Sequence, residues 1–418
     1  MPALMSHAPL SHKLDFLDKG TVFTLLVAAL GYFVDAFDLI LFGVVRIPSL
    51  KSIGVADSDT LSTGLLLINM QMAGLLVGGF LWGVLGDKFG RLSVLLGSIL
   101  LYSIATLANA FVDSVLSYVG LRFLAGIGLA GELGVGITLV SELLPRQYRG
   151  LGSAFIGTIG MLGAVMAGFI GESFDWRMAY MIGGCMGFAL LFMRVGLKES
   201  GLYLTVAQNT HVPRGSFVSL FSNLSLLRRY IAVIFVPLPL LTMIWILVAF
   251  TPEFARNFGA SVPLQAGKAI IFCYIGLTIG DALSGLLSQL LKSRRKAIAF
   301  FLLLLTAGCA AHLVCRPATA QLYYASCLLM GLAGGYWIVA IQLAAEQFGT
   351  NIRATATTSV PTVARALIIP ATMGFKALSP LVGVVSSWAI IMLVALGLSV
   401  LGLLSLKESF HRDLDYVE

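Results

Sequence analysis

Long apolar stretches separated by short polar segments run through almost the whole sequence. A helix needs roughly 20 apolar residues to cross a lipid bilayer, and stretches of that length recur along the chain. They predict about twelve membrane-spanning helices, near residues 21–45, 61–85, 92–112, 115–139, 151–171, 178–196, 229–250, 264–290, 297–315, 320–344, 355–378 and 384–405. This pattern predicts an all-α integral membrane protein.

The composition supports the same class. Hydrophobic residues make up 58% of the 418 residues and charged residues 11%, whereas soluble domains carry about 25% charged residues. The net charge of +7 does not indicate nucleic-acid binding, because the basic residues gather in alternate loops. With both termini in the cytoplasm, the inner loops hold most Lys and Arg, among them Arg194, and the outer loops hold few, among them Arg46. The positive-inside rule therefore predicts this orientation.

The sequence outside the spans adds little chemistry. Residues 1–20 are polar and carry charges of both signs, so we expect no cleavable signal peptide. The five cysteines lie in or beside apolar spans, which is more typical of buried packing than of disulfides or metal ligands. We expect no metal and no cofactor, and a multi-pass protein of a bacterial inner membrane.

The chain also repeats itself. Glu142 and Arg149 follow the fourth span with the same spacing that Glu346 and Arg353 show after the tenth. The tetrapeptide Leu-Lys-Glu-Ser closes both the sixth and the twelfth span. We therefore expect two six-helix halves with a substrate site near the membrane midplane, where they meet. The predicted domains are an N-terminal bundle at 1–197, a cytoplasmic linker with a short amphipathic helix at 198–228, and a C-terminal bundle at 229–418.

Ionisable residues inside the spans are the main functional signal. Asp35 and Asp38 lie in the first span, where a carboxylate costs roughly 2.5–3.5 kcal/mol on insertion scales. Arg122 lies early in the fourth span. At ~1.5 Å per residue, both acids and Arg122 fall in the outer half of the bilayer, so an ion pair is geometrically possible. Two acids this close titrate as a pair, so either could carry a proton.

Two further buried charges leave alternatives open. Glu132, deeper in the fourth span, could receive a proton on the inward side or simply bond neighbouring helices. Arg365 stands alone in the eleventh span and suits a substrate carboxylate. Its alternative partner is Asp281 of the eighth span, in a purely structural ion pair.

Short motifs point to a family. Gly86-Asp-Lys-Phe-Gly-Arg91, between the second and third spans, resembles the loop signature of the major facilitator superfamily. Arg122-Phe-Leu-Ala-Gly-Ile-Gly-Leu-Ala-Gly-Glu132 and Glu142-Leu-Leu-Pro145 resemble the sugar porters and their metabolite:proton and aromatic-acid:proton relatives. This resemblance implies the twelve-helix major facilitator fold with two pseudo-symmetric bundles, acting as a monomer. It also implies that an acid of the first span, best matched by Asp38, pairs with Arg122 and carries the coupling proton.

The sequence departs from the sugar branch at both halves' ends. The sixth span closes with Lys198-Glu-Ser-Gly201 rather than Pro-Glu-Ser-Pro, and the twelfth lacks the Pro-Glu-Thr signature. The Asp35-Ala-Phe-Asp38 pair and the Gly131-Glu132 dipeptide resemble the organic-acid branches more closely. These features favour an organic acid over a sugar as the substrate.

The expected site has three groups of residues. The proton-coupling group is Asp38, Asp35, Arg122 and Glu132. The substrate-binding group, placed near mid-span, is Arg365, Gln71, Tyr274, Trp337 and Gln342. The gating group, in the loops that flank the moving helices, is Asp87, Arg91, Glu142, Arg149, Glu346 and Arg353.

These residues lead to one main functional hypothesis. We expect a secondary transporter that imports a small organic acid together with protons by alternating access, with the bilayer, protons and the substrate as its only partners. The alternatives are proton-linked export of an amphiphilic solute and sugar:proton symport. We expect no enzyme activity, because no His-acid pair, metal cluster or nucleotide loop is evident.

Overall fold

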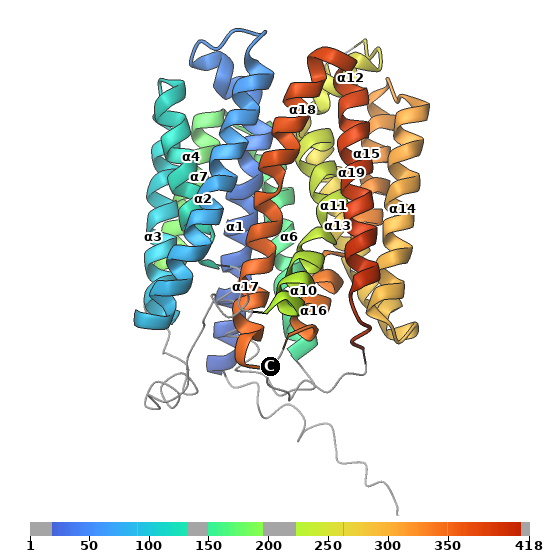
Figure 1. Ribbon diagram of the computed structural model, residues 1–418. Coiled ribbons are helices and arrows are strands. Elements are labelled where there is room, and N and C mark those ends of the chain that lie inside the picture. Colours follow the sequence, from blue (N-terminus) through green and yellow to red (C-terminus); the bar gives the residue numbers. More distant parts are fainter. Residues whose placement is uncertain are drawn as a thin grey trace, which may run out of the picture.

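The computed structural model describes residues 19–89, 91–132, 149–194, 223–261, 263–348 and 350–410, and these are overwhelmingly helical (Figure 1). The helices run side by side between two ends of a bundle. We call the end at which the first helix begins the inner end and the opposite one the outer end. The N-terminal half, drawn in blue to green, contains α1 (Lys19–Ser52), α2 (Thr60–Phe89), α3 (Arg91–Asn109), α4 (Val115–Leu129), α6 (Arg149–Ser173) and α7 (Trp176–Arg194).

The C-terminal half, drawn in yellow-green to red, lies beside it. Its helices are α10 (Leu224–Phe235), α11 (Leu238–Thr242), the π-helix η2 (Met243–Val248), α12 (Thr251–Asn257), α13 (Ala266–Leu290), α14 (Arg294–Cys315), α15 (Ala320–Gly334), α16 (Trp337–Glu346), α17 (Thr350–Ala366), α18 (Ile368–Val382) and α19 (Val384–Ser405).

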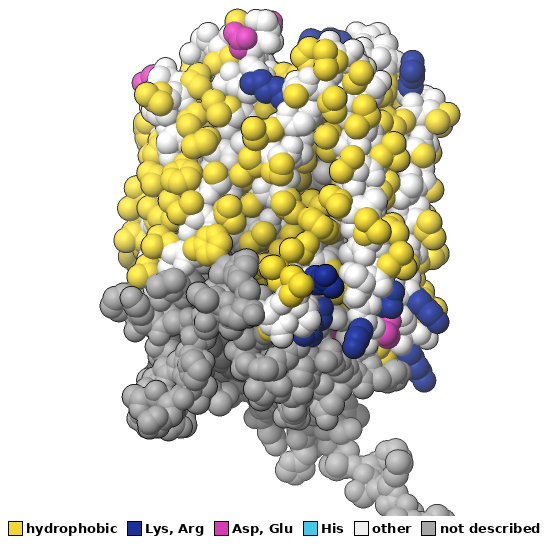
Figure 2. Space-filling model, in the orientation of Figure 1, with side chains coloured by type: hydrophobic (Ala, Val, Ile, Leu, Met, Phe, Trp, Pro, Cys, Tyr) yellow, Lys and Arg dark blue, Asp and Glu magenta, His cyan; other side chains and the backbone are white. Residues whose placement is uncertain are grey.

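The helices account for all twelve predicted spans. Nine helical segments of the described residues are long and apolar enough to cross a membrane, and α3 and α4 contain shorter apolar helices. The remaining span consists of α17 and α18 together. In Figure 2 the side of the molecule is covered by hydrophobic side chains, and the Lys, Arg, Asp and Glu side chains in view lie toward the two ends. The chain is a multi-pass membrane protein with the predicted fold.

Three spans of the C-terminal half are interrupted. Pro237 and Pro239 separate α10 from α11, because proline lacks the N–H that would continue the helical hydrogen bonds. The same span continues through η2, whose wider turns are rare in proteins. The tenth span breaks between α15 and α16 at Gly335, and the eleventh breaks at Leu367, two residues after Arg365. Interrupted helices of this kind form substrate sites in many transporters.

Glycine allows the closest helix contacts. A Cβ on Gly335 would lie 2.1 Å from the backbone carbon of Gly280, and a Cβ on Gly331 would lie 2.0 Å from the carbonyl oxygen of Cys273. α15 therefore packs backbone to backbone against α13, as small residues permit in membrane helices.

Two helix ends differ from the prediction. α1 continues to Ser52, so Arg46 lies within the helix and is fully buried rather than in an outer loop. α10 begins at Leu224, so Leu224 and Leu227 belong to a membrane-spanning helix rather than to a linker helix. The rest of the predicted linker helix lies outside the described residues. The domain boundaries stay a prediction.

Candidate functional site

Asp38 and Arg122 meet inside the N-terminal bundle. Both side chains are fully buried, and Nη1 of Arg122 lies 4.0 Å from Oδ2 of Asp38. The other carboxylate oxygen accepts a hydrogen bond of 2.6 Å from Thr106 of α3. Nη2 of Arg122 donates to the side-chain oxygen of Gln71 on α2. The expected contact is present but loose, since charge-assisted hydrogen bonds are usually about 2.7–2.9 Å long.

Because the contact between Asp38 and Arg122 is long, several buried polar atoms of the two side chains lack a hydrogen-bond partner. Oδ2 of Asp38 and Nε and Nη1 of Arg122 have no hydrogen-bond partner among the described residues. A buried charge without full pairing is costly, which favours an arrangement that changes when a proton or a substrate arrives. A pair at 4.0 Å can tighten or separate with little movement of the backbone.

Asp35 lies one helical turn toward the inner end and is almost fully buried. Neither of its carboxylate oxygens accepts a hydrogen bond within the described part of the chain. Toward the inner end again lies Glu132, which binds Arg194 of α7 through two hydrogen bonds of 2.9 and 2.8 Å. Gly31 of α1, one helical turn before Asp35, packs directly against the Glu132–Arg194 pair, because a Cβ there would lie 2.1 Å from Nη2 of Arg194. The three acids thus form a row along the bundle.

Arg194 is a correction to the sequence interpretation, which placed it in an inner loop. It is the last residue of α7 and is almost fully buried against Glu132. Sequence reasoning missed it because span boundaries are uncertain by a few residues. The useful signal would have been the need of Glu132 for a cation within reach.

A central cavity of about 40 Å³ lies between the two halves. It is lined from the N-terminal half by α1 and α6, and from the C-terminal half by the interrupted spans and α13. The lining residues are Tyr32, Ala36, Leu39, Ile40, Met161, Leu240, Leu241, Ile244, Trp245, Tyr274, Leu277, Trp337 and Arg365. Pockets for drug-sized ligands usually measure roughly 300–1,000 Å³, so this cavity must widen to admit a substrate.

Arg365 supplies the one cation of the cavity lining. Its guanidinium carbon lies 5.6 Å from the ring centre of Trp337, within the range of a cation–π contact. Among the described residues no carboxylate lies within 4.0 Å of it. The alternative partner, Asp281, instead accepts a hydrogen bond of 3.3 Å from the backbone N–H of Ile338 at the start of α16, where the helix dipole favours a negative charge.

The predicted substrate-binding residues divide into two groups. Arg365, Tyr274 and Trp337 line the cavity. Gln71 and Gln342 do not, and Gln71 instead accepts the hydrogen bond from Arg122. Trp245, a weaker candidate from its mid-span position, also lines the cavity. Tyr32 lines it too, and sequence reasoning missed this residue because its ring had no distinguishing signal in a sequence this rich in apolar residues.

Two polar contacts join the halves at other points. Nη2 of Arg46 lies 2.8 and 2.9 Å from the two carboxylate oxygens of Glu253 on α12. The guanidinium also lies 4.1 Å from the ring centre of Phe250. Thr372 of α18 donates a hydrogen bond to the side-chain oxygen of Asn69 on α2. These contacts hold the outer parts of the two halves together.

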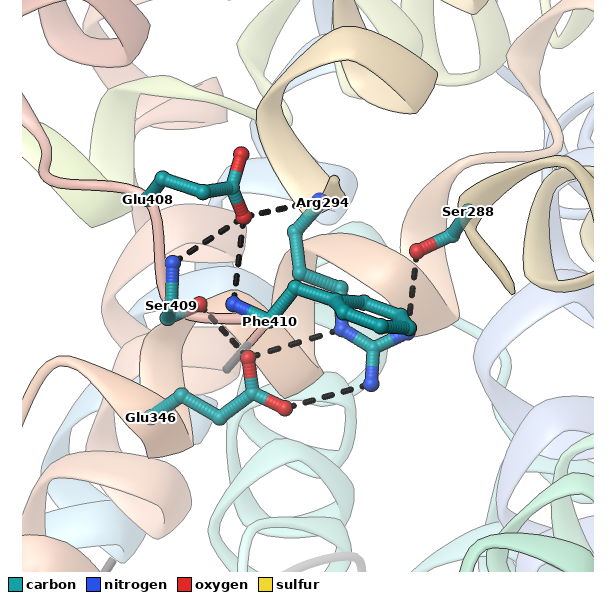
Figure 3. A network of polar contacts seen from close by, with 6 residues as sticks. All are labelled: Ser288, Arg294, Glu346, Glu408, Ser409 and Phe410. Carbon is teal, nitrogen blue, oxygen red and sulfur yellow. Dashed lines mark hydrogen bonds and ion pairs between the residues drawn. The ribbon is translucent and has the colours of Figure 1, made fainter. Parts of the chain in front are cut away.

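A polar network closes the inner end of the C-terminal half (Figure 3). Arg294 pairs with Glu346 at 3.3 Å, and the hydroxyl of Ser409 donates to Glu346 at 2.6 Å. Glu408 accepts hydrogen bonds from the hydroxyl of Ser293 and the backbone N–H of Arg294. In the view, the chain beyond α19 lies against the ends of α14 and α16.

Of the predicted gating residues, Glu346 is therefore placed, and its partner is Arg294. Arg353 lies in α17, and Arg149 begins α6, but their side chains are outside the described part of the structure, as are those of Asp87 and Arg91. Glu142 lies outside the described residues. The gating roles stay predictions. Within the described residues there is no group of three or more His, Cys, Asp or Glu side chains that could hold a metal.

The sequence profile of the Major Facilitator Superfamily matches residues 28–369. The chain belongs to the major facilitator superfamily. It is 29% identical over 338 residues to a Bacillus subtilis protein named for niacin and nicotinamide transport, covering 79% of this chain and 81% of that protein. It is 32% identical over 189 residues to a Pseudomonas putida 4-hydroxybenzoate transporter, covering 43% of this chain and 41% of the relative.

A solved structure confirms the fold. The crystal structure of a D-xylose-proton symporter superposes with a TM-score of 0.70 at 18% sequence identity, covering 93% of this chain and 98% of the symporter. The family and these relatives are transporters, so the chain is a transporter and not an enzyme. Its relatives transport niacin and aromatic acids, which places a small molecule as its cargo.

Proposed function

We propose that the protein is a proton-coupled symporter that imports a small aromatic monocarboxylic acid across the bacterial inner membrane, with both termini in the cytoplasm. The observation that carries this proposal is the position of Arg365. It is the cation of the cavity lining, it has no carboxylate partner among the described residues, and aromatic rings surround it.

The lining suits such a cargo on both of its chemical features. A guanidinium binds a carboxylate through parallel hydrogen bonds, and that geometry is lost with Lys. Tyr32, Trp245, Tyr274 and Trp337 offer ring faces and edges for an aromatic body, and aromatic pairs contribute about 0.5–1.5 kcal/mol beyond their area. The niacin and 4-hydroxybenzoate relatives support the same substrate class.

Proton coupling rests on the N-terminal bundle. The incompletely paired Asp38 and Arg122 lie within the same bundle as the unpartnered Asp35, all screened from water. An acid inside a membrane helix commonly relays protons in transporters. We assign the coupling proton to the Asp35 and Asp38 pair, which titrates as a unit. Rocking of the two halves about the cavity then moves proton and acid together.

A sugar is the less suitable cargo. The described lining contains two tyrosine hydroxyls and one guanidinium but no amide or carboxylate side chain. Sugars need several hydrogen-bonding partners to replace their lost water, because unpaired buried hydroxyls are costly. The likeness to the xylose symporter supports the fold rather than the substrate.

The test is uptake by purified protein in proteoliposomes with imposed pH gradients. Niacin, 4-hydroxybenzoate and D-xylose are offered in turn, inside and outside pH being set independently. A symporter drives the acids toward the alkaline compartment, and an antiporter drives them toward the acidic one. Accumulation of D-xylose but of neither acid would overturn the substrate class.

The variant Arg365→Lys tests directly whether Arg365 binds the carboxylate of the substrate. It keeps the positive charge but loses the planar fork, so we expect its KM for the transported acid to rise by about tenfold, or about 1.4 kcal/mol. Arg316→Lys, at an exposed position after α14, is the matched control and should leave KM unchanged. An unchanged KM in Arg365→Lys would remove this residue from the binding site.

A further inference from the structure

One face of α3 carries a stripe of hydroxyl groups into the N-terminal bundle. Ser98, Tyr102 and Thr106 are spaced four residues apart, which places them above one another along a helix. Ser103 adjoins Tyr102. All four side chains are fully buried, although nothing about a membrane-spanning helix requires hydroxyls in its interior.

The two ends of this hydroxyl stripe contact two of the three acids of the bundle, Asp38 and Glu132. At its outer end Thr106 donates a hydrogen bond of 2.6 Å to Oδ1 of Asp38. At its inner end Ser98 donates a hydrogen bond of 3.4 Å to Oε1 of Glu132. Eight residues of α helix span about 12 Å. The stripe therefore bridges the distance between a proton-coupling acid and an acid nearer the inner end.

The middle of the stripe is unpartnered. The hydroxyls of Tyr102 and Ser103, and both carboxylate oxygens of Asp35, have no hydrogen-bond partner among the described residues. A buried polar group left unpaired costs about 1–3 kcal/mol, so each one in a native protein calls for an explanation. Tyr102 and Ser103 are neighbours on α3, and the charge of Asp35 acts on Tyr102, so the three groups point to a shared role.

Glycines of the neighbouring helices make room for these hydroxyls. A Cβ on Gly187 of α7 would lie 2.2 Å from Oγ of Ser103 and 3.0 Å from the ring of Tyr102. A Cβ on Gly128 of α4 would lie 2.5 Å from Cβ of Tyr102. α4 and α7 could not approach α3 this closely with any larger residue at those two positions.

The charged groups around the stripe come from four spans. α1 contributes Asp35 and Asp38, the fourth span contributes Arg122 and Glu132, and α7 contributes Arg194. From the opposite half, the positive charge of Arg365 on α17 acts on Asp35. α2 contributes the neutral amide of Gln71. Charge therefore stands at both ends of the stripe, with an unpaired acid beside its middle.

We propose that the hydroxyl stripe of α3 is a proton path inside the N-terminal bundle, which leads from Asp38 past Asp35, Ser103 and Tyr102 to Glu132. This proposal rests on the proposed proton coupling. The O–H bond of protonated Asp38 breaks as an O–H bond forms on the next oxygen, with water molecules closing the gaps. Each hydroxyl accepts one proton and releases another, so its own protonation is unchanged.

The last transfer places the proton on the carboxylate of Glu132. Glu132 then becomes neutral and loses its attraction for Arg194, which is the final residue of α7 and can turn toward the water at the inner end. The O–H bond of Glu132 breaks as the proton passes to that water. The restored carboxylate binds Arg194 again.

This path is separate from the substrate cavity. None of Ser98, Tyr102, Ser103, Glu132 and Arg194 is among the residues that line the cavity. A variant of the stripe should therefore affect proton movement without affecting substrate binding. That separation gives the proposal a selective test.

The experiment compares two modes of transport in proteoliposomes. Accumulation driven by a pH gradient requires net proton movement, whereas exchange of labelled for unlabelled substrate at equal pH requires only the loaded protein to reorient. The probe is whichever of niacin and 4-hydroxybenzoate the wild type accumulates better. The variants are Tyr102→Phe, Ser103→Ala and their combination. Tyr323→Phe, which removes a hydroxyl from an equally buried ring of the C-terminal half, is the matched control.

We expect the double variant to lose accumulation by about tenfold or more, in line with the loss of a proton-transfer group, and to keep exchange within about twofold of wild type. Retained exchange shows that the variant is folded. Unchanged accumulation in the double variant would overturn the path while leaving the proposed function intact. An equal loss of both modes, or the same loss in Tyr323→Phe, would also overturn it. Failure of the wild type to accumulate either acid would overturn the proposed function and the path with it.

Discussion

The two halves of the molecule share a fold but bury different chemistry. The described N-terminal half buries Asp35, Asp38, Arg46, Arg122, Glu132 and Arg194, and α1 runs without a break past both aspartates. The charged side chains buried to the same degree in the described C-terminal half are Asp281 and Arg365. That half instead has three interrupted spans, and these supply six of the thirteen residues that line the cavity.

This difference indicates a division of labour. A proton needs only a row of polar atoms, which rigid helices can hold at fixed spacing. A substrate needs a cavity that widens and closes, and broken helices bend more readily than continuous ones. The sequence repeats predict two equivalent bundles, and the described residues of the two halves differ by buried charge in one and helix breaks in the other. Four predictions bear on this division.

The strongest contrast should come from one acid in each half. Asp38→Asn removes the ionisable group that faces Arg122, and we expect pH-driven accumulation to fall by about 100-fold or more while exchange persists. Asp281→Asn keeps an acceptor for the N–H of Ile338, so it should leave accumulation within about twofold of wild type. Uptake of labelled acid under both conditions measures this. Equal losses of accumulation in the two variants would show that the two halves do not divide proton coupling and substrate binding between them.

The Glu132–Arg194 pair should be costly to break from one side. Removing one partner of a buried ion pair typically costs about 3–5 kcal/mol, because the other charge is left without compensation. We expect Arg194→Met to lower thermal stability in detergent strongly, and the double variant Glu132→Gln/Arg194→Met to recover part of the loss. If the double variant is no more stable than Arg194→Met, the pair is not a coupled unit.

The Arg46–Glu253 contact should control access from the outer end. In Arg46→Gln the half-buried Glu253 loses its cation and favours states in which more water reaches it. We expect an impermeant thiol reagent added outside to label Leu39→Cys in the cavity about tenfold faster, which corresponds to about 1.4 kcal/mol. Cys185 and Cys315, the exposed native thiols, are replaced by serine in this background. Arg316→Gln serves as the control, and equal labelling rates in both would show that the contact does not hold the outer end closed.

The smallest effect should come from the inner polar network. Burial raises the pKa of the Glu408 carboxyl. Hydrogen bonds from the Ser293 hydroxyl and from the backbone N–H groups of Arg294, Ser409 and Phe410 together lower it by more than burial raises it, so the pKa lies below the usual 4.5. A lowered pKa means that ionised Glu408 stabilises the folded protein above about pH 4.5 and that this stabilisation is lost as the pH falls through the folded-state pKa.

We therefore expect Glu408→Gln to reduce stability at pH 7 by about 1 kcal/mol or less, because the group is largely exposed. The difference from wild type should shrink as the pH falls below 4.5. Thermal unfolding in detergent at several pH values measures both. A difference that grows on acidification would contradict the assigned sign.

The contact between Asp38 and Arg122 could be predicted from the sequence because depth in a membrane helix follows from counting residues. Each turn advances by a known amount, and the bilayer sets the origin. The same counting missed Arg194, which is the last residue of its span, and Arg46, because α1 continues to Ser52, well past the predicted end at residue 45. A residue moved from loop to core changes its chemistry completely.

The hydroxyl stripe could not be predicted for a different reason. Ser98, Tyr102 and Thr106 carry no formal charge, and hydroxyls in membrane helices usually serve helix packing. Only the three-dimensional arrangement brings them between Asp38 and Glu132. The cavity lining could likewise be predicted only in part. Pro237 and Pro239 predict a helix break but not which side chains the break turns toward the cavity.

The π-helix η2 allows the side chains of the seventh span to rotate about the helix axis if its turns tighten. A turn of this kind holds one residue more than an α-helical turn, and each residue of an α-helix turns the chain by about 100°. If η2 tightens to ordinary α geometry, Trp245 swings around the axis while α12 stays tied through Glu253 to the opposite half. Movement of this one side chain would then change the shape of the cavity while the contact between Arg46 and Glu253 stays in place.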